Sequence, residues 1–351
     1  QSRARMKMTI TSRLLTIGLA LTVLAACAKE PSRSLPKLDI DPARVMVAGL
    51  SSGAYMATQS HIAWPQVFSG AALVAGGPYG CAAGDLGRAL SACMKGKPAI
   101  DLAGLAGEVR QRSAQGKLGD LSALAGDHVY VLHGRSDDTV AESVSRDAAG
   151  LYTALQTQLP ALSSLDVQWD GGRAFGHNLP LASSGDDCAE SVSPFLGHCG
   201  FDAAGEIFAH LYGKPTSQAQ TAQGELRSFS QKQLNGHLPD TYLSDTGYAY
   251  VPRACLAGTR CGVLVVFHGC QQNAEAVGET FVRDAGFNRW ADVYNVAVLY
   301  PQTRATFAPL NPKACWDWWG FSGDNYDTRQ GLQQQWLMHA LAALGVPRAT
   351  R

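Results

Sequence analysis

The stretch Val45–Gly53, with the sequence VMVAGLSSG, decides the fold. Its first four residues are apolar, which is typical of a buried strand. Gly49 and Gly53 then flank Ser51, and this pattern predicts a sharp, strained turn from a strand into a helix, where a side chain on either glycine would crowd the backbone. Ser51 would stand at the tip of this turn, clear of the sheet, as a nucleophile elbow does. Glycine and serine also fill ordinary loops, so the rest of the chain has to support this interpretation.

The composition indicates a globular protein. Of the 351 residues, 46% are hydrophobic and 17% are charged, with a formal net charge of zero. Such a chain can bury a large core, and its composition argues against disorder. The sequence has no basic block, no phosphate-loop pattern and no paired Cys-x-x-Cys of zinc spacing. We therefore expect no nucleic-acid partner, no metal and no cofactor, and we expect a monomer.

The N-terminus has the features of an export signal. Lys7 and Arg13 precede an apolar stretch over residues 14–26 that is too short for a comfortable membrane span. The stretch ends in Leu-Ala-Ala before Cys27, which resembles a bacterial lipobox, so we predict a signal peptide over residues 1–27 with Cys27 lipidated. An ordinary signal peptide that happens to contain Cys27 is the alternative. We expect an exported protein at the outer membrane or cell surface, or otherwise in the periplasm or outside the cell.

Export makes disulfide bonds the expected use of the other cysteines, because an even number of them would face an oxidising compartment. Eight cysteines allow many connectivities, and metal ligation is the competing use. Proximity in the sequence suggests the pairs Cys81–Cys93, Cys188–Cys199 and Cys255–Cys261, which leaves Cys270 and Cys315 to pair.

One domain is expected after a short tether. Residues 28–42 are polar and punctuated by prolines, so we predict the tether there and the domain over residues 43–351. Polar and aromatic residues alternate over 220–251, as in an antiparallel edge hairpin, and residues 329–344 have the period of a helix. Short apolar runs elsewhere indicate strands of a mostly parallel sheet that is buried on both faces. These runs are residues 71–75, 129–132, 165–169, 263–267 and 296–300.

Two later loops offer the partners that a catalytic serine needs, a histidine that accepts its proton and a buried acid that orients the histidine. Asp137 follows a predicted strand at the end where α/β sheets place functional groups, and we predict it as the acid. Asp138 is the fallback, and a solvated turn without function is the alternative. His177, in a glycine-rich loop after the next strand, is the predicted base. The order Ser51, Asp137, His177 is that of the α/β hydrolases.

Acyl transfer also needs amide donors for the oxyanion. Ser52, directly after the nucleophile, supplies one amide. The strand 263–267 runs into a His-Gly turn whose Cys270 amide would supply the other. In the usual α/β-hydrolase fold this turn comes before the serine, so its late position indicates a circular permutation. In the parent order, the helix at 329–344 would lead directly into the strand at Val45.

Together these residues resemble the polyhydroxybutyrate depolymerase family, in its single-domain, circularly permuted form. The resemblance covers most of residues 44–351 and implies an α/β-hydrolase fold with a mostly parallel central sheet, in which the oxyanion-hole strand lies C-terminal to the triad. It also implies a secreted serine esterase that cleaves short-side-chain polyhydroxyalkanoates or their oligomers, with the triad and oxyanion roles given above. The matching motifs are Gly49–Met56, Ala75–Cys81, Phe175–His177, Phe267–Gln272 and Leu299–Gln302.

Residues 315–321 concentrate three tryptophans, and a bond between Cys270 and Cys315 would hold them beside the oxyanion turn. An aromatic wall there could pack against a methyl-bearing polyester. We select Trp316, together with His268 of the turn, for this substrate contact. The alternative is that these tryptophans serve only the core.

Two other functions stay open. A feruloyl or acetyl-xylan esterase would share the fold and triad but would use a sugar-facing cleft. A non-catalytic surface lipoprotein could keep the scaffold for binding, although binding alone does not require a triad. Many extracellular relatives carry a separate polymer-binding domain after a linker, whereas this chain ends soon after its last helix. We therefore expect oligomers or amorphous polymer as substrates rather than crystalline polymer.

Overall fold

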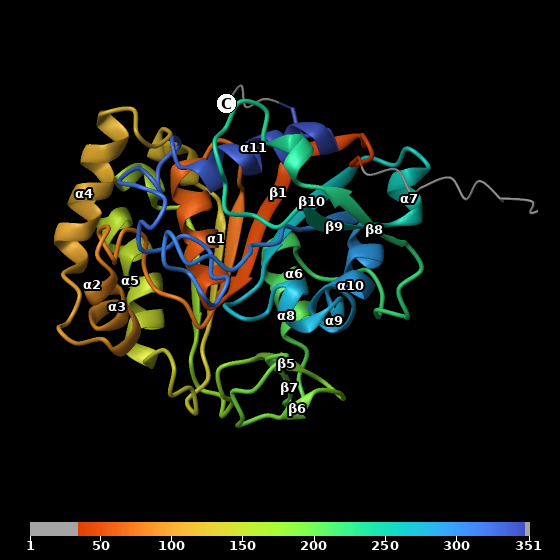
Figure 1. The fold of residues 1–351 in the computed structure, drawn as a ribbon, viewed down its shortest axis with the longest axis horizontal. Coiled ribbons are helices and arrows are strands. Elements are labelled where there is room, and N and C mark those ends of the chain that lie inside the picture. The colour runs from red at the N-terminus through yellow and green to blue at the C-terminus, as the bar shows by residue number, and fades with distance from the viewer. Residues whose placement is uncertain (1–33, 348–351) are drawn as a thin grey trace, which may run out of the picture. The chain divides into compact units, whose positions relative to one another are not determined.

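The protein is represented by a computed structural model, which describes residues 34–347. The predicted signal peptide, its Cys27 and the first part of the tether lie outside the described residues. An eight-stranded sheet forms the centre of the described part, with the long strand β1 (Ile40–Leu50) in its middle (Figure 1). The other strands of this sheet are β2 (Gly70–Val74), β3 (His128–Leu132), β4 (Asp166–Asp170), β8 (Glu225–Ser230), β9 (Thr246–Val251), β10 (Cys261–Phe267) and β11 (Val296–Tyr300).

The sheet is mostly parallel, as predicted. Its strand order is β4-β3-β2-β1-β10-β11-β9-β8. Neighbours from β4 to β11 run parallel, and β9 and β8 complete the sheet as an antiparallel edge hairpin. Every residue of β2, β10 and β11 is buried, as their continuous apolar runs indicate for strands covered on both faces.

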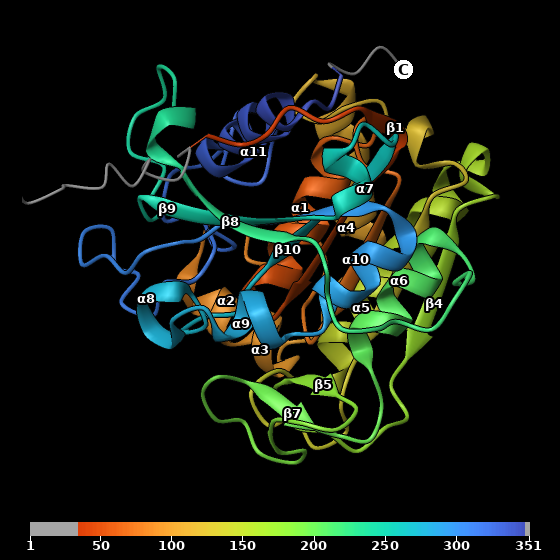
Figure 2. The same ribbon diagram turned by 90° about the vertical axis from the view of Figure 1, so that its right-hand side faces the viewer.

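Helices cover both faces of the sheet (Figure 1, Figure 2). Alternate residues of β1 separate the two cores, with Val45 and Val47 in one and Met46 and Ala48 in the other. The first core includes α1 (Ser52–Ala63), α4 (Leu102–Ala114), α5 (Glu142–Gln158) and α11 (Leu332–Leu344), and the second includes α6 (Ala203–Tyr212), α9 (Thr280–Asp284) and α10 (Phe287–Tyr294). The connections carry the short helices α2 (Leu86–Leu90), α3 (Ala92–Lys95), α7 (Arg253–Leu256) and α8 (Ala274–Val277). Among the described helices we find none with the length and apolar character to cross a membrane.

The topology contains the expected permutation. Strand β10 follows the predicted triad in the sequence, yet it pairs with β1, with Val45 opposite Val263 and Gly49 opposite Phe267. The segment before β1 also lies against the end of α11, because the Leu38 amide donates to the Leu344 carbonyl at 2.8 Å. In the parent order α11 would lead into β1, and the contact brings those two elements together.

The domain begins earlier than the predicted boundary at residue 42. Strand β1 starts at Ile40, inside the stretch that we assigned to the tether. Leu38 and Ile40 are buried in the first core, and the Asp39 carbonyl accepts the amide of Cys261 at 2.9 Å. These tertiary contacts order a segment whose sequence is polar and rich in proline. The domain therefore begins before residue 43, the predicted boundary.

Four disulfide bonds use the eight cysteines of the described chain, in the pairing suggested by the sequence. Three of them close short segments, and the fourth ties the turn after β10 to the loop before α11. These cysteines are therefore not available as thiolate ligands for a metal. The bonds are Cys81–Cys93, Cys188–Cys199, Cys255–Cys261 and Cys270–Cys315.

A second, small sheet stands apart from the main one (Figure 1). It consists of β5 (Leu179–Leu181), β7 (Leu196–His198) and β6 (Asp186–Asp187). The loop that carries His177 leads directly into β5. Cys188 follows β6 and Cys199 follows β7, so their disulfide bond holds the ends of these two strands together. The small sheet thereby supports the loop that carries His177.

Candidate active site

Ser51 lies in the turn between β1 and α1. Its backbone has φ of 57° and ψ of −123°, a conformation that is strained for a residue other than glycine. The Ser51 amide donates to the Val74 carbonyl at 2.9 Å, and its carbonyl accepts the amides of Ala54 and Tyr55 at 2.8 and 3.2 Å. The surrounding backbone thus holds the serine in the strained turn that the sequence predicts.

The two glycines of this stretch allow close backbone contacts. A Cβ atom on Gly49 would lie 2.2 Å from the backbone of Gly53. A Cβ atom on Gly53 would lie 2.2 Å from the carbonyl oxygen of Phe267 and 2.6 Å from that of His268. The absence of a side chain at Gly53 therefore lets α1 approach the end of β10, which brings the serine beside the turn that follows β10.

Asp137 and His177 come from the loops after β3 and β4, and their side chains meet. Asp137 Oδ2 lies 2.7 Å from His177 Nδ1, and Asp137 Oδ1 accepts the amides of Thr139 and Val140 at 2.8 and 2.9 Å. Burial of the Asp137 side chain opposes ionisation, but the hydrogen bond and charge of His177 and the Val140 amide outweigh it, so the pKa of Asp137 is lowered. Asp138, the fallback, is exposed.

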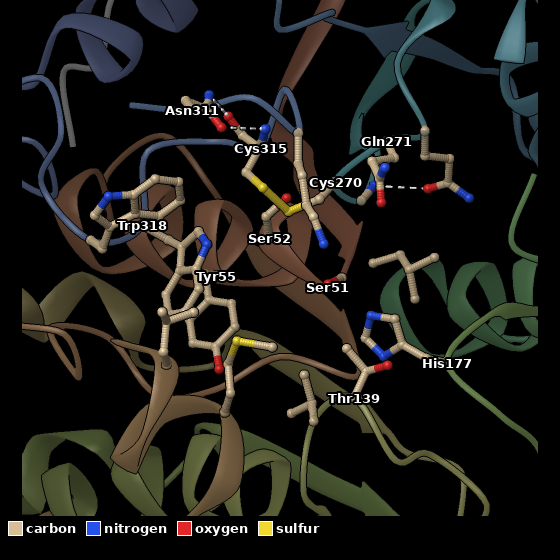
Figure 3. Close-up of a pocket in the computed structure, with 18 of the residues that line it drawn as sticks. Ser51, Ser52, Tyr55, Thr139, His177, Cys270, Gln271, Asn311, Cys315 and Trp318 are labelled. Atoms are coloured by element: carbon tan, nitrogen blue, oxygen red, sulfur yellow. Dashed lines mark hydrogen bonds between the residues drawn. A yellow bond between two sulfur atoms is a disulfide. The ribbon is translucent and has the colours of Figure 1, made fainter. Parts of the chain in front are cut away.

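Ser51 and His177 line one pocket, with the His177 ring directed toward the serine (Figure 3). Because Nδ1 of the ring faces Asp137, Nε2 is left as the acceptor of a neutral imidazole. Within residues 34–347 the serine hydroxyl and Nε2 do not form a hydrogen bond, and such bonds often tighten only when substrate is bound. The arrangement can move a proton from a serine hydroxyl to a histidine that a carboxylate orients.

The loop around His177 is tied to the small sheet. The His177 amide donates to Ser191 Oγ at 2.8 Å, and the amide of Gly176 donates to the Cys188 carbonyl at 2.8 Å. The Asn178 side chain donates to the carbonyls of Cys188 and Glu190 at 3.0 and 2.8 Å. These bonds fix the backbone on either side of the histidine.

Ser52 and Cys270, the predicted oxyanion donors, both line the pocket. Over the described chain, neither of their amides donates a hydrogen bond to a protein acceptor, so both are free to bind a ligand oxygen. The turn that carries Cys270 is fixed from two sides. The Gly269 amide donates to Gln272 Oε1 and the Gln271 amide to the Lys313 carbonyl, both at 2.7 Å.

Trp316 and His268 lie beneath this turn, which corrects the prediction that they contact substrate. Both side chains are buried, and neither is among the residues that line the pocket. Trp316 Nε1 donates to the His268 carbonyl at 3.1 Å, while His268 Nδ1 donates to Gly269 and His268 Nε2 accepts the Thr303 amide at 3.2 Å. Burial lowers the pKa of His268 to about 4. The two residues support the turn from below.

The aromatic wall consists of residues that the sequence interpretation did not select. Trp318 stacks on Tyr55 with 4.3 Å between ring centroids, and Trp319 packs edge-on against Trp318 at 5.6 Å. The spacing of Tyr55 was a usable signal, since residues four apart share a helix face and Tyr55 follows Ser51 by four. The pocket has a volume of about 480 Å³, and its further apolar lining is Leu50, Leu86, Leu90, Met94, Val140, Phe195 and Leu310.

Apolar side chains continue from this wall to the surface. Phe307 is 88% exposed and Leu310 is 58% exposed, and they belong to one loop. Among the described residues, three of the five exposed large hydrophobic side chains line the pocket, namely Leu86, Leu90 and Leu310. Val192 adjoins the lining residue Ser191, and Phe307 precedes Leu310 in its loop, so we name the five residues together the apolar rim. The apolar rim consists of Leu86, Leu90, Val192, Phe307 and Leu310. Within residues 34–347 we find no group of three or more His, Cys, Asp or Glu side chains that could hold a metal ion.

Comparisons with known proteins agree on one family. The family described as Esterase PHB depolymerase matches residues 246–331. The poly(3-hydroxybutyrate) depolymerase of Delftia acidovorans is 34% identical over 327 residues, which are 92% of this chain but 63% of that relative. The chain thus spans less than two thirds of the length of the Delftia protein. The polyhydroxybutyrate depolymerase of Talaromyces funiculosus is 32% identical over 336 residues, 91% of this chain and 94% of the relative.

Two solved structures are similar over the same region. A PHB depolymerase complexed with an R3HB trimer superimposes with a TM-score of 0.79 at 29% identity, over 89% of this chain and 98% of the other. The PHB depolymerase from Penicillium funiculosum gives a TM-score of 0.78 at 30% identity, with the same coverage of both chains.

Proposed function

The chain belongs to the polyhydroxybutyrate depolymerase family, and on this premise we propose that it is a serine esterase that hydrolyses ester bonds of poly(3-hydroxybutyrate) and related short-side-chain polyhydroxyalkanoates, or of their oligomers. One observation carries the proposal. Ser51, His177, Ser52 and Cys270 line a single, mainly apolar pocket, and Asp137, buried behind His177, forms a hydrogen bond with its ring. A volume of about 480 Å³ lies within the range of small-molecule sites.

The proposed reaction proceeds through an acyl-enzyme. His177 Nε2 accepts the hydroxyl proton as Ser51 Oγ bonds to the ester carbon, and the amides of Ser52 and Cys270 bind the oxyanion. The carbon–oxygen ester bond then breaks, and the leaving hydroxyl takes its proton from His177. Water attacks the acyl-enzyme by the same route and releases the carboxylate product. Asp137 stabilises the imidazolium in both steps. The reaction needs no cofactor.

The apolar rim supports a polyester substrate over a carbohydrate ester. A polyhydroxybutyrate chain presents methyl groups and ester oxygens but no hydroxyls along its length. The aromatic wall and the apolar rim offer it an uncharged surface on which apolar area can be buried. A cleft for xylan or feruloylated sugar would instead require many polar groups placed to satisfy sugar hydroxyls. This contrast favours the polyester over feruloyl and acetyl-xylan esters.

Export is part of the proposal. Four disulfide bonds are typical of proteins in oxidising compartments and support an exported protein. Lipidation at Cys27 remains a proposal from the sequence, and with it the attachment to an outer membrane or cell surface. We propose a monomer in both cases.

The test compares classes of substrate at equal enzyme concentration. We expect release of 3-hydroxybutyrate units or short oligomers from amorphous poly(3-hydroxybutyrate), and slower or no release of ferulate or acetate from sugar esters. Phe307→Ser serves as the matched variant, because Phe307 is exposed and does not line the pocket, so its loss should reduce polymer hydrolysis while it preserves hydrolysis of a soluble trimer. Faster release of ferulate or acetate would contradict the polyester assignment. A folded protein that is inert to a serine-directed phosphonate would favour the non-catalytic alternative.

A further inference from the structure

Lys313 is the exception in an otherwise uncharged pocket wall. Of the described residues that line the pocket, it is the one whose side chain carries a full charge at neutral pH, and none is an Asp or Glu. Lys313 is exposed, and it forms no ion pair within residues 34–347. The acid of the site does not neutralise it, since the Asp137 carboxylate is buried behind His177. An unpaired ammonium group therefore borders a site with apolar walls.

The backbone of Lys313 is fixed relative to the reacting groups. Its carbonyl accepts the amide of Gln271 at 2.7 Å, directly beside the Cys270 amide. Two residues later, Cys315 forms the disulfide bond to Cys270. Asn311 clamps the same segment, since its side chain accepts the Cys315 amide and donates to the Cys315 carbonyl, both at 2.9 Å. The ammonium thus has a fixed point of attachment beside the oxyanion turn, and its flexible stem provides reach.

A substrate of the proposed class offers one group that suits this cation. The interior of a polyhydroxyalkanoate chain is uncharged, one end is a hydroxyl, and the other end is a carboxylate. We propose that Lys313 binds the terminal carboxylate of a short oligoester and so gives the enzyme a preference for soluble oligomers with a free acid end. This inference rests on the proposed esterase function. Hydrogen bonds between charged groups are stronger than those between neutral groups.

The size of the preference follows from the exposure of the lysine. Because Lys313 is exposed to solvent, its ion pair is partly screened, and we expect a preference of roughly 1.5-fold to fivefold in kcat/KM. The effect should appear mainly in KM, because the charge contacts a part of the substrate that does not react. It should shrink as the salt concentration rises.

The experiment uses two trimers of 3-hydroxybutyrate that differ in charge alone, one with a free carboxylate and one with that group converted to a primary amide. We expect wild type to prefer the acid, and Lys313→Met to hydrolyse both trimers with equal kcat/KM. Lys313→Arg should keep the preference. Lys214→Met, at an exposed lysine outside the pocket, is the charge-matched control and should behave as wild type.

The outcomes separate this inference from the function on which it rests. If wild type and Lys313→Met hydrolyse both trimers with the same ratio of kcat/KM, the carboxylate contact is overturned while the esterase function stands. If folded wild type hydrolyses neither trimer, both the function and the contact are overturned. A preference that is lost in Lys313→Met and kept in Lys214→Met supports the contact.

Discussion

A methyl group at residue 53 should push apart two parts of the candidate active site, the Ser51 turn before α1 and the Cys270 turn after β10. A Cβ atom there would lie 2.2 Å from the Phe267 carbonyl oxygen and 2.6 Å from that of His268, whereas ordinary contact begins at 3.4 Å. Both obstacles are backbone atoms at the end of β10, so no side-chain rotation relieves the overlap. We therefore expect Gly53→Ala to push α1 and the turn after β10 apart by on the order of 1 Å.

The displacement acts on both stability and rate. Overpacking of a buried site costs about 1–3 kcal/mol, and we expect this loss in the free energy of unfolding measured by urea denaturation. Ser52 adjoins Gly53 and the Cys270 amide lies on the displaced turn, so the proposed oxyanion donors would no longer converge. A misplacement of about 1 Å can cost roughly 100-fold in rate. We expect a loss of that order in kcat for the soluble trimer of 3-hydroxybutyrate.

Gly172 supplies the control. It lies in the loop before His177, and a Cβ atom there would meet no atom within 4 Å. Gly172→Ala should change the free energy of unfolding by less than about 0.5 kcal/mol and leave kcat unchanged. If Gly53→Ala had the unfolding free energy and kcat of wild type, the reasoning that close backbone approach assembles the site would be refuted.

Three further changes test the acid, the buried histidine and the central disulfide. Asp137→Asn should lower kcat by about 10³- to 10⁴-fold with the fold intact, because the asparagine amide does not stabilise the imidazolium of His177. Asp138→Asn should leave kcat unchanged, and equal losses in the two variants would contradict the assignment of the acid. Burial lowers the pKa of the His268 imidazole from 6.5 to about 4. Between these two pH values the unfolded chain therefore binds a proton at His268 and the folded protein does not, so stability falls as the pH falls. We expect the free energy of unfolding of wild type to fall by up to about 3 kcal/mol across this pH range, and that of His268→Gln to fall by less. If urea denaturation gave both proteins the same dependence of unfolding free energy on pH, this linkage would be wrong. Replacing Cys270 and Cys315 by serine removes a disulfide bond between residues 45 apart in the sequence, and it should lower the free energy of unfolding by about 4 kcal/mol. Unchanged stability and kcat would show that the bond does not hold the oxyanion turn.

The fold could be predicted from the sequence where local chemistry decides it. The apolar runs predict buried strands wherever both faces of the sheet are covered, and all five of them are strands in the structure. The turn at Ser51 is local on the Gly49 side, where a Cβ atom would meet the backbone of Gly53 within the same strand-turn-helix unit, whereas Gly53 is required by its distant neighbour β10. The boundary at Ile40 was missed for the opposite reason. Ile40 pairs with Cys261 of β10, and the amide of Leu38 donates to the Leu344 carbonyl of α11, so the partners of this segment lie far away in the sequence.

The pocket wall could be predicted only in part. Trp316 and Trp318 are two residues apart in an irregular loop without helical or strand period, so the sequence does not indicate which ring faces the pocket. In the structure, Asp317 between them is buried and accepts the amides of Gly320 and Phe321 at 2.8 and 2.9 Å. The loop then directs Trp318 onto Tyr55 and leaves Trp316 in the core. Which of the two tryptophans faces the pocket therefore depends on tertiary contacts, and a local sequence pattern does not indicate them.

The most direct test of the central claim measures product release from amorphous poly(3-hydroxybutyrate) and from its soluble oligomers. Protein without the signal segment is compared with Ser51→Ala at equal concentration, and a common unfolding midpoint shows that both are folded. We predict that wild type releases 3-hydroxybutyrate units or short oligomers and that Ser51→Ala releases none above background. Hydrolysis that persists in Ser51→Ala would contradict Ser51 as the nucleophile, and a folded wild type that cleaves neither polymer nor oligomer would contradict the esterase function itself.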